Sequence, residues 1–196
     1  MTQKHAIERD DLLSMDEYGK VRAEWRRKMT ALKRDRRIEI GPFVTFYFES
    51  WQTMWHQVHE MLFIERGGEG QIEDELTAYN PLIPQGQDLS ATFMIEIDDP
   101  DRRKRMLLRL GGIEETTFLQ FGEHTVEGTP ELDQDRTSAE GKASSVQFVH
   151  FHFTASQIAA FRTPGVQVTL GFRHPNYGHL AVLPEDVRSA LAGDFD

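Results

Sequence analysis

Apolar residues recur every three or four positions along several stretches of the chain, a pattern that predicts amphipathic helices. The first stretch covers residues 14–36, where Ser14 and Glu17 have the spacing of an N-terminal capping box. A second helix is predicted over residues 51–65, in which tryptophan, methionine, valine and leucine side chains share one face. Shorter helices are predicted over residues 72–79, after Asp99-Pro100, from Thr154 or Ser156 to Phe161, and after Pro184.

Alternation of apolar and polar residues predicts strands between these helices. The clearest strand covers residues 145–154. Its alternating side chains are Val149, Phe151 and Phe153 on one face and Phe148, His150 and His152 on the other. Further strands are predicted over residues 38–49, with a turn or bulge at Gly41-Pro42, and over residues 89–97, 116–121 and 166–174. Residues 122–143 are mostly polar and acidic, so we expect a long loop there, with a hairpin inside it as the alternative.

The order of these elements predicts the fold class. Strands are interleaved with helices, yet several connections are short or loop-like, which disfavours a doubly wound parallel sheet. We therefore expect an α+β fold, with an antiparallel or mixed sheet, helices packed mainly on one side, and a long basic amphipathic helix near the N-terminus. The 196 residues contain no internal repeat and no linker, so residues 1–196 are expected to form a single domain, with residues 1–13 flexible.

Composition excludes several kinds of chemistry. The chain has no cysteine, which removes disulfides, iron–sulfur ligation by this chain and thiol catalysis. A bound metal would have to be held by histidine, aspartate or glutamate. The N-terminal residues are too polar for a signal peptide, and no apolar run approaches the roughly 18 residues of a membrane helix. The expected location is the cytoplasm.

Basic residues are concentrated in one segment of an acidic chain. The net charge is −10, whereas residues 20–37 hold nine lysine and arginine side chains opposed by Glu24 and Asp35. One interpretation is a solvated helix face that partly neutralises the acidic body. The other is a docking surface for an acidic partner; its predicted contacts are Arg26, Arg27, Arg34 and Arg37. Nucleic acid is disfavoured as the partner by the overall charge and by the absence of a known motif.

Histidines form two candidate metal-binding patterns. His56, His59 and Glu60 occupy neighbouring helical positions that can face one metal, although the spacing also suits an exposed polar helix face. His150 and His152 lie on one face of a strand, about 7 Å apart. Such a pair can hold a first-row metal, and the alternative is two half-buried, hydrogen-bonded rings.

Three further residues are candidates because of their predicted surroundings. His174 ends a strand and begins a turn that could aim its ring inward, or could be an ordinary turn. Glu65 projects onto the apolar face of its predicted helix, and Glu96 lies on the face of its predicted strand opposite to Phe93. A carboxylate among core residues must be paired, protonated or ligating. A structural ion pair with Arg66 or Arg173 is the alternative to ligation.

Many residues spread along the chain resemble one bacterial family. They are Asp10-Asp11-Leu12-Leu13, Tyr18, Arg37, Gly41-Pro42, Phe48-Glu49, Gln57, Glu60-Met61-Leu62, Glu65-Arg66, Glu75-Leu76, Ala78-Tyr79-Asn80, Leu82-Ile83-Pro84, Ala91-Thr92, Ile95-Glu96 and His174-Pro175. The family that they resemble is the bacterial domain-of-unknown-function family 3501, over about residues 10–177, and residues 60–84 are the most specific block. His56 and His59 depart from the family pattern, which counts against a metal site at that pair.

The resemblance implies a role near iron or peroxide metabolism, because members tend to be encoded beside rubrerythrin-like di-iron proteins and iron–sulfur proteins. The first hypothesis is a metal-binding accessory protein in redox or oxidative-stress metabolism, holding iron, zinc or manganese. Its candidate ligands are Glu60, Glu65, Glu96 and His174, then His150 and His152, in a pocket with Tyr79, Asn80 and Arg66.

Two other hypotheses stay open. The chain could be a non-catalytic interaction module, in which residues 20–37 dock an acidic partner such as a neighbouring redox or di-iron protein. It could also be an enzyme for a small organic substrate held against aromatic strands, although no catalytic motif supports this. The sequence does not decide between an enzyme and a binding protein.

Overall fold

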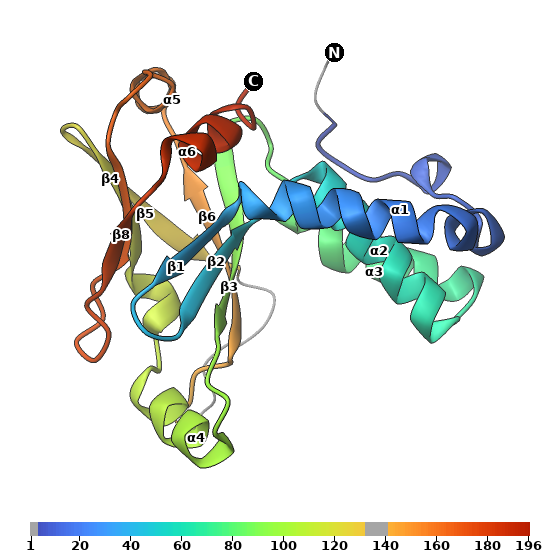
Figure 1. Cartoon of the computed structure of the whole chain (residues 1–196), viewed down its shortest axis with the longest axis horizontal. Helices are drawn as coiled ribbons and strands as arrows, with labels where there is room; N and C mark the ends of the chain where they lie inside the picture. Colours follow the sequence, from blue (N-terminus) through green and yellow to red (C-terminus); the bar gives the residue numbers. More distant parts are fainter. Residues whose placement is uncertain (1–3, 132–140) are drawn as a thin grey trace.

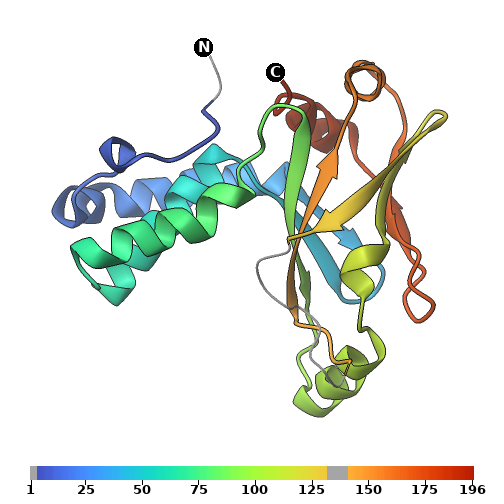
Figure 2. The same ribbon diagram turned by 180° about the vertical axis from the view of Figure 1, so that it is seen from behind.

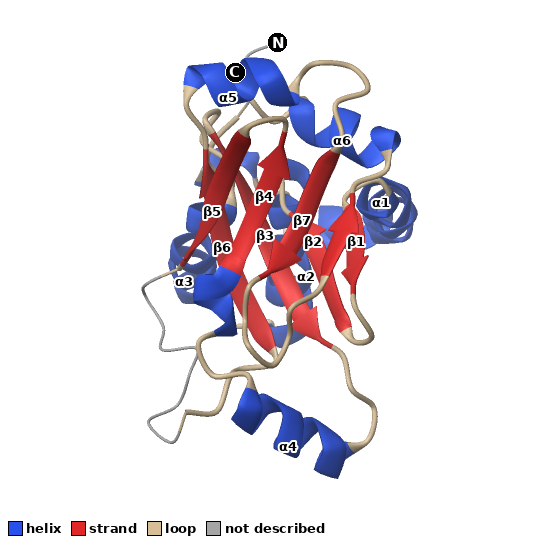
Figure 3. Ribbon diagram, turned by 90° about the vertical axis from the view of Figure 1, so that its left-hand side faces the viewer, coloured by secondary structure: helices blue, strands red, loops and turns tan. Residues whose placement is uncertain are grey.

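The structure is a computed structural model that describes residues 4–131 and 141–196. It consists of a barrel made of one curled sheet and an arm of helices that extends from the outside of the barrel (Figure 1). Figure 2 shows the same two parts from behind, and Figure 3 views the barrel with the arm behind it. The junction of the arm with the barrel places side chains from both parts against one another.

The described residues form an eight-stranded sheet in which all neighbouring strands are antiparallel. The strands are β1 (Arg37–Ile40), β2 (Val44–Phe48), β3 (Asp88–Ile95), β4 (Thr117–Phe121), β5 (His124–Pro130), β6 (Val146–His152), β7 (Val168–Phe172) and β8 (Leu180–Val182). Their order is β1-β2-β3-β6-β5-β4-β7-β8, and the edge strands β1 and β8 come into contact. The sheet is therefore a nearly closed barrel.

The helices occupy three places around this barrel. They are η1 (Arg9–Asp11), α1 (Met15–Arg34), α2 (Trp51–Glu65), α3 (Glu69–Tyr79), η2 (Asn80–Leu82), α4 (Pro100–Arg109), η3 (Ile113–Thr116), α5 (Ala155–Phe161) and α6 (Glu185–Ala192). The arm consists of α1, α2 and α3, whereas α5 and α6 lie at one end of the barrel and α4 at the other (Figures 1 and 2). In the described part of the chain, no helix has both the length and the apolar character needed to cross a membrane.

Alternation along the strands fills the barrel with aromatic rings. Phe46, Phe93 and Phe172 point inward, with ring centroids 5.0–5.4 Å apart. Each such side chain contributes about 1.5–3 kcal/mol when it leaves water completely. A second core holds the arm together, and Tyr18, Trp55 and Val58 are among its buried side chains. The barrel and the arm thus have separate cores that meet at the outer face of the sheet.

Much of the predicted secondary structure is confirmed. Ser14 caps α1 through a capping box with Glu17, and α2 covers residues 51–65 as expected. Gly41 forms the turn between β1 and β2 with a φ of 66°. Helices α1, α2 and α3 lie together on one side of the sheet, as expected, whereas the shorter α4, α5 and α6 lie at the two ends of a barrel that was not predicted. Alternation is the same in an open sheet and in a barrel, so the pattern does not distinguish them.

Two segments expected to lack structure are ordered in part. Residues 122–143 are not simply a loop, because β5 pairs with β4 to make the alternative hairpin; residues 132–140 lie outside the described residues. Residues 4–13 are packed rather than flexible. Ile7 is buried and its backbone is bonded by Asn80, while Trp51 donates to the backbone of Ala6. These contacts bind the start of the chain to the arm.

Candidate functional site

The outer face of β2, β3 and β6 forms the floor of a cavity. Ala91 and Phe93 point into the barrel, so Thr92 between them points outward. Thr92 lies opposite Tyr47 of β2 and opposite Phe148 of β6. Tyr47, Thr92 and Phe148 therefore form a row on the outer face of the sheet. With their neighbours on the same face, they make a surface that has both aromatic and polar groups.

The arm covers this floor and closes the cavity, which we call the arm–barrel pocket. It has a volume of about 410 Å³, within the usual range for small-molecule sites. Its lining consists of Lys33, Tyr47, Glu49, Met54, Gln57, Tyr79, Leu82, Thr92, Met94, Val146 and Phe148. The mixture of apolar walls and a few convergent polar groups is typical of a site for a small organic molecule.

Glu49 is the acidic group in the wall of this pocket, which Lys33 also lines, and only 5% of the Glu49 surface is exposed. Its Oε1 accepts a hydrogen bond from Thr92 Oγ1 at 2.7 Å, and its Oε2 accepts one from Thr53 Oγ1 at 2.7 Å. A carboxylate has about four acceptor sites, so both oxygens can accept further bonds. Among the described residues, no lysine, arginine or histidine forms an ion pair with this carboxylate.

The nearby Arg36 does not neutralise Glu49, because it is bound elsewhere. Its Nη1 donates to the backbone oxygen of Glu49 at 3.0 Å and to Asp194 Oδ2 at 2.8 Å, and its Nη2 donates to Asp194 Oδ1. The guanidinium is buried and its charge is matched by the carboxylate of Asp194. A buried carboxylate without such a partner is costly to desolvate, which makes the Glu49 side of the pocket attractive for a cation.

Two tyrosines supply neutral hydroxyl groups to the pocket. Burial raises the pKa of Tyr79, the nearby charges of Glu75, Glu65 and Glu49 raise it further, and a hydrogen bond from Gln57 partly opposes them. Burial likewise raises the pKa of Tyr47, which is also hydrogen-bonded to Glu96. Both phenols therefore stay protonated at neutral pH and can donate hydrogen bonds.

The predicted ligands His56, His59 and Glu60 lie on the far side of α2 from this pocket, against α1. The alternative of an exposed polar face is wrong for the histidines, because α2 is covered by α1 there and His59 is fully buried. Glu60 accepts two hydrogen bonds from Arg22 at 2.8 Å and one from the Tyr18 hydroxyl at 2.7 Å. The Arg22 guanidinium, above all, lowers the pKa of Glu60 to about 2 despite partial burial.

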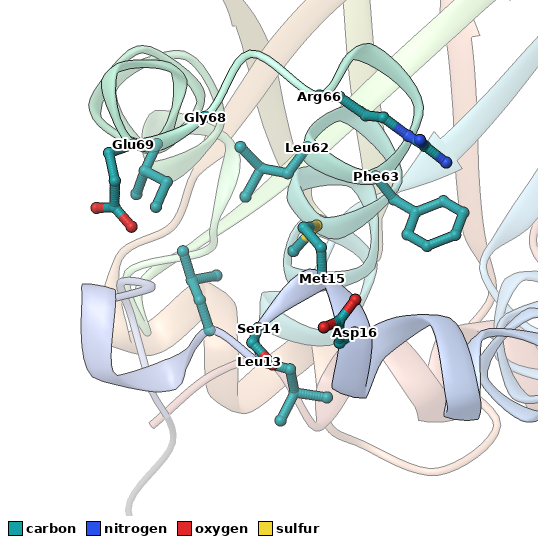
Figure 4. A pocket seen from close by; sticks show the side chains of 11 residues that line it. Leu13, Ser14, Met15, Asp16, Leu62, Phe63, Arg66, Gly68 and Glu69 are labelled. Carbon is teal, nitrogen blue, oxygen red and sulfur yellow. The ribbon is translucent and has the colours of Figure 1, made fainter.

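Glu65 and Arg66 lie at the exposed end of α2, so the prediction that Glu65 is surrounded by core residues is wrong. The helix ends there, and Glu65 accepts a hydrogen bond from Gln71 at 2.9 Å instead of facing the core. Arg66 adopts a left-handed φ of 55°. It lines a separate pocket of about 560 Å³ at the tip of the arm, beside Leu62, Phe63 and the residues that precede α1 (Figure 4).

The other predicted residues lie at separate places. Glu96 is exposed and accepts from Thr45 at 2.6 Å, so neither proposed arginine is its partner. His174 is buried in a turn, where its Nδ1 accepts from the Asn176 backbone and its Nε2 lies 3.2 Å from the Gly111 oxygen. Asn80 accepts from and donates to the backbone of Ile7.

His150 is held between two carboxylates at the edge of the arm. Its Nδ1 lies 3.5 Å from Asp88 Oδ2 and its Nε2 lies 3.0 Å from Glu131 Oε2. Burial lowers the pKa of His150, but the hydrogen bonds and charges of these carboxylates outweigh it and raise the pKa overall. The ring of His152 is nearly parallel to that of His150, at 6.0 Å.

The structure does not gather the predicted ligands into one site. Within residues 4–131 and 141–196, no group of three or more histidine, aspartate or glutamate side chains is arranged to hold a metal ion. Of the residues predicted for a pocket, Tyr79 lines the arm–barrel pocket, and Glu96 lies next to its Tyr47 wall.

Sequence reasoning missed Glu49, Gln57, Thr92 and Lys33 as site residues. Three of them are among the positions that carry the family resemblance, which was the available signal. These four residues lie close together only because the arm packs against the barrel, and no local sequence pattern predicts that packing.

The predicted partner-binding arginines are all exposed. Arg34 pairs with Asp35 at 3.0 Å and Arg37 pairs with Glu39 at 2.6 Å. Within the described residues, neither Arg26 nor Arg27 forms an ion pair, although both lie on the exposed side of α1. The solvated-face interpretation and the docking interpretation both fit this arrangement.

Comparison with known proteins gives a family and a fold but no activity. No curated protein matches the chain. A crystal structure of a novel protein of unknown function from Burkholderia pseudomallei K96243 is 36% identical, covers 97% of this chain and 100% of that chain, and superposes with a TM-score of 0.90. The model of the family described as a protein of unknown function, DUF3501, matches residues 6–195. The chain therefore belongs to the DUF3501 family.

Proposed function

We propose that this protein binds a small organic molecule in the arm–barrel pocket, and that a cationic nitrogen of the ligand lies against Glu49. The observation that carries the proposal is the buried carboxylate of Glu49, which lines the pocket and has no ion-pair partner among the described residues. Burial makes an unpaired charge costly, and a ligand ammonium would form a charge-assisted hydrogen bond with it.

The walls of the pocket suit an organic cation. Tyr47, Tyr79 and Phe148 present aromatic rings, whose faces attract cations. Met54 and Met94 add polarisable apolar surface for the carbon skeleton of a ligand. The carboxylates that raise the pKa of Tyr79 also make this side of the pocket negative. A primary amine with an apolar chain is the simplest molecule that satisfies both kinds of wall.

Isothermal titration calorimetry with hexylamine tests the proposal. The protein is expected to bind hexylamine and to reject hexanol and hexanoate. Glu49→Gln removes the charge with little change in shape, and should weaken binding at least tenfold, the loss of one charge-assisted hydrogen bond. Glu114→Gln is the matched control, because Glu114 is similarly buried but lies on η3, outside the lining of the pocket. Equal loss in both variants, or no binding of hexylamine, would contradict the proposal.

Docking of an acidic partner is a second candidate function. The exposed Arg26 and Arg27, without ion pairs in the described residues, support it. Binding to an acidic protein, such as a neighbouring redox or di-iron protein, should weaken steeply as salt rises. The double variant Arg26→Glu, Arg27→Glu should abolish it, whereas Arg9→Glu should not, since Arg9 lies on η1 and pairs with Glu69 and Glu73. Binding that survives the double variant would exclude this surface.

Metal binding in redox or oxidative-stress metabolism stays a prediction. Its strongest support is His150, which has a carboxylate beside each ring nitrogen. A metal there would have to displace at least one of those contacts. Elemental mass spectrometry of protein purified without a histidine tag is the test, and near-stoichiometric iron, zinc or manganese that falls in Asp88→Asn would support it. Metal-free protein from metal-replete cells would count against it.

A further inference from the structure

Lys33 lies where the arm–barrel pocket meets a second hollow. This hollow, which we call the seam cleft, has a volume of about 650 Å³ and runs over the place where β1 approaches β8. Its lining is Thr30, Lys33, Arg34, Arg37, Ile38, Glu39, Tyr47, Ala181, Val182 and Pro184. Lys33 and Tyr47 line both hollows, so these two side chains lie between the arm–barrel pocket and the seam cleft.

The seam cleft is more basic than the arm–barrel pocket, whose charged lining residues are Lys33 and Glu49. The seam cleft is lined by Lys33, Arg34 and Arg37 against the single carboxylate of Glu39. Arg34 and Arg37 pair with exposed neighbours, and exposed pairs of this kind hold their partners weakly. Lys33 is only partly exposed and forms no ion pair within the described residues. The arm–barrel pocket, in contrast, has the Glu49 carboxylate in its wall.

We infer that the ligand is bipolar, with its cationic nitrogen at Glu49 and an anionic group, a carboxylate or a phosphate, at Lys33 and the opening of the seam cleft. This inference rests on the proposed function, because it names the class of molecule that the same pocket binds. An amino acid with a separated amine and acid, or an aminoalkyl phosphate, has this chemistry. A ligand with only a cationic group or only an anionic group would pair with only one of the two charged side chains, Glu49 or Lys33.

A simpler role for Lys33 is to neutralise Glu49 through solvent in the free protein. The two roles differ in their consequence. If Lys33 serves Glu49, removing its charge should strengthen the binding of a simple amine, because a competitor for the carboxylate is lost. If Lys33 holds the anionic end of the ligand, its removal should weaken only those ligands that carry an anion.

Calorimetry with hexylamine, 6-aminohexanoate and 6-aminohexyl phosphate tests the inference on the full chain. At least one of the two bipolar ligands should bind about tenfold more tightly than hexylamine, and the better of them identifies the anion. Lys33→Met should abolish this preference, so that hexylamine and the bipolar ligands bind to the variant with similar affinity. Lys28→Met is the matched control, because Lys28 lies on the same helix but pairs with Glu24. It should keep the preference.

The outcomes separate the inference from the proposed function. Equal binding of hexylamine and both bipolar ligands would overturn the bipolar inference and leave the proposed function standing. A preference for the bipolar ligands that persists in Lys33→Met, with hexylamine bound more tightly, would also overturn it, in favour of the neutralising role. Binding of none of the three ligands at millimolar concentration would count against both. Circular dichroism of each variant identifies a variant that has failed to fold, in which case Lys33→Gln replaces Lys33→Met.

Discussion

At the scale of single residues, the histidine between Asp88 and Glu131 makes the stability of the protein depend on pH. The pKa of His150 is higher in the folded protein than its usual value of 6.5. The folded state therefore holds the proton more tightly than the unfolded state. The resulting stabilisation is complete below the unfolded pKa of about 6.5, and it is lost as the pH rises through the raised folded pKa.

We predict that His150→Gln lowers the free energy of unfolding more at about pH 5.5 than at about pH 8.5, because only the protonated ring gains from both carboxylates. Urea denaturation of both proteins at these two pH values measures the difference. His152→Gln removes the neighbouring ring and keeps the contacts of His150, so it is the control. A cost of His150→Gln that is equal at both pH values would contradict the prediction.

At the scale of elements, the arm is held to the start of the chain by a few directed hydrogen bonds. Asn80, where α3 passes into η2, accepts from the backbone nitrogen of Ile7 at 2.8 Å and donates to its oxygen at 3.0 Å. The indole nitrogens of Trp51 and Trp55 donate to the backbone oxygens of Ala6 and Asp11. These bonds keep residues 6–11 against α2 and α3, and so contribute to the stability of the arm.

We predict that Asn80→Ala destabilises the protein by about 1–3 kcal/mol, because it leaves two backbone groups of Ile7 without their partner. Hydrogen exchange of the amides of residues 6–11 should accelerate, while exchange in β3 and β6 should change little. Asn176→Ala is the control, since Asn176 lies in the turn at the far side of the barrel and bonds Arg109. Acceleration spread evenly through the barrel would contradict this prediction.

Local patterns predict a helix or strand well when its apolar face or its capping residue is enough to define it. Ser14 and Glu17 fixed the start of α1, and alternation in β6 separated inward Phe151 from outward His150. The strand β8 was missed because three residues, two of them exposed, carry too little pattern. Glu65 was predicted to lie among core residues because it projects onto the same side of the helix as the apolar residues. Glu65 is the last residue of α2, however, and its side chain is exposed there.

At the scale of the whole molecule, one buried ion pair joins the two ends of the fold. Arg36, between α1 and β1, is paired with Asp194, which follows α6, and both side chains are less than 10% exposed. The same guanidinium donates to the backbone of Glu49 at the wall of the arm–barrel pocket. Arg36 is one of the nine basic residues in the segment 20–37, for which the charge pattern predicts a solvated helix face or a docking surface. Its partner is 158 positions away, and composition carries no signal over that separation.

We predict that Asp194→Asn destabilises the protein by about 3–5 kcal/mol, because the Arg36 charge stays buried without its partner. The double variant Arg36→Met, Asp194→Leu should recover most of this loss, since it removes both charges together. Urea denaturation at neutral pH is the measurement. Glu127→Gln, which breaks the exposed Arg173–Glu127 pair, should cost less than about 1 kcal/mol. Equal costs for the buried and the exposed pair would contradict the prediction.

The aromatic filling of the barrel has a consequence for how this family can diversify. The interior of the barrel is a packed core that includes Phe46, Phe93 and Phe172, and each of these buried rings contributes to stability. The arm–barrel pocket lies outside, and five of its eleven lining residues come from α1, α2, α3 and η2. A substitution at Met54, on α2, can therefore change specificity without disturbing the barrel, so relatives can keep one scaffold and acquire different ligands.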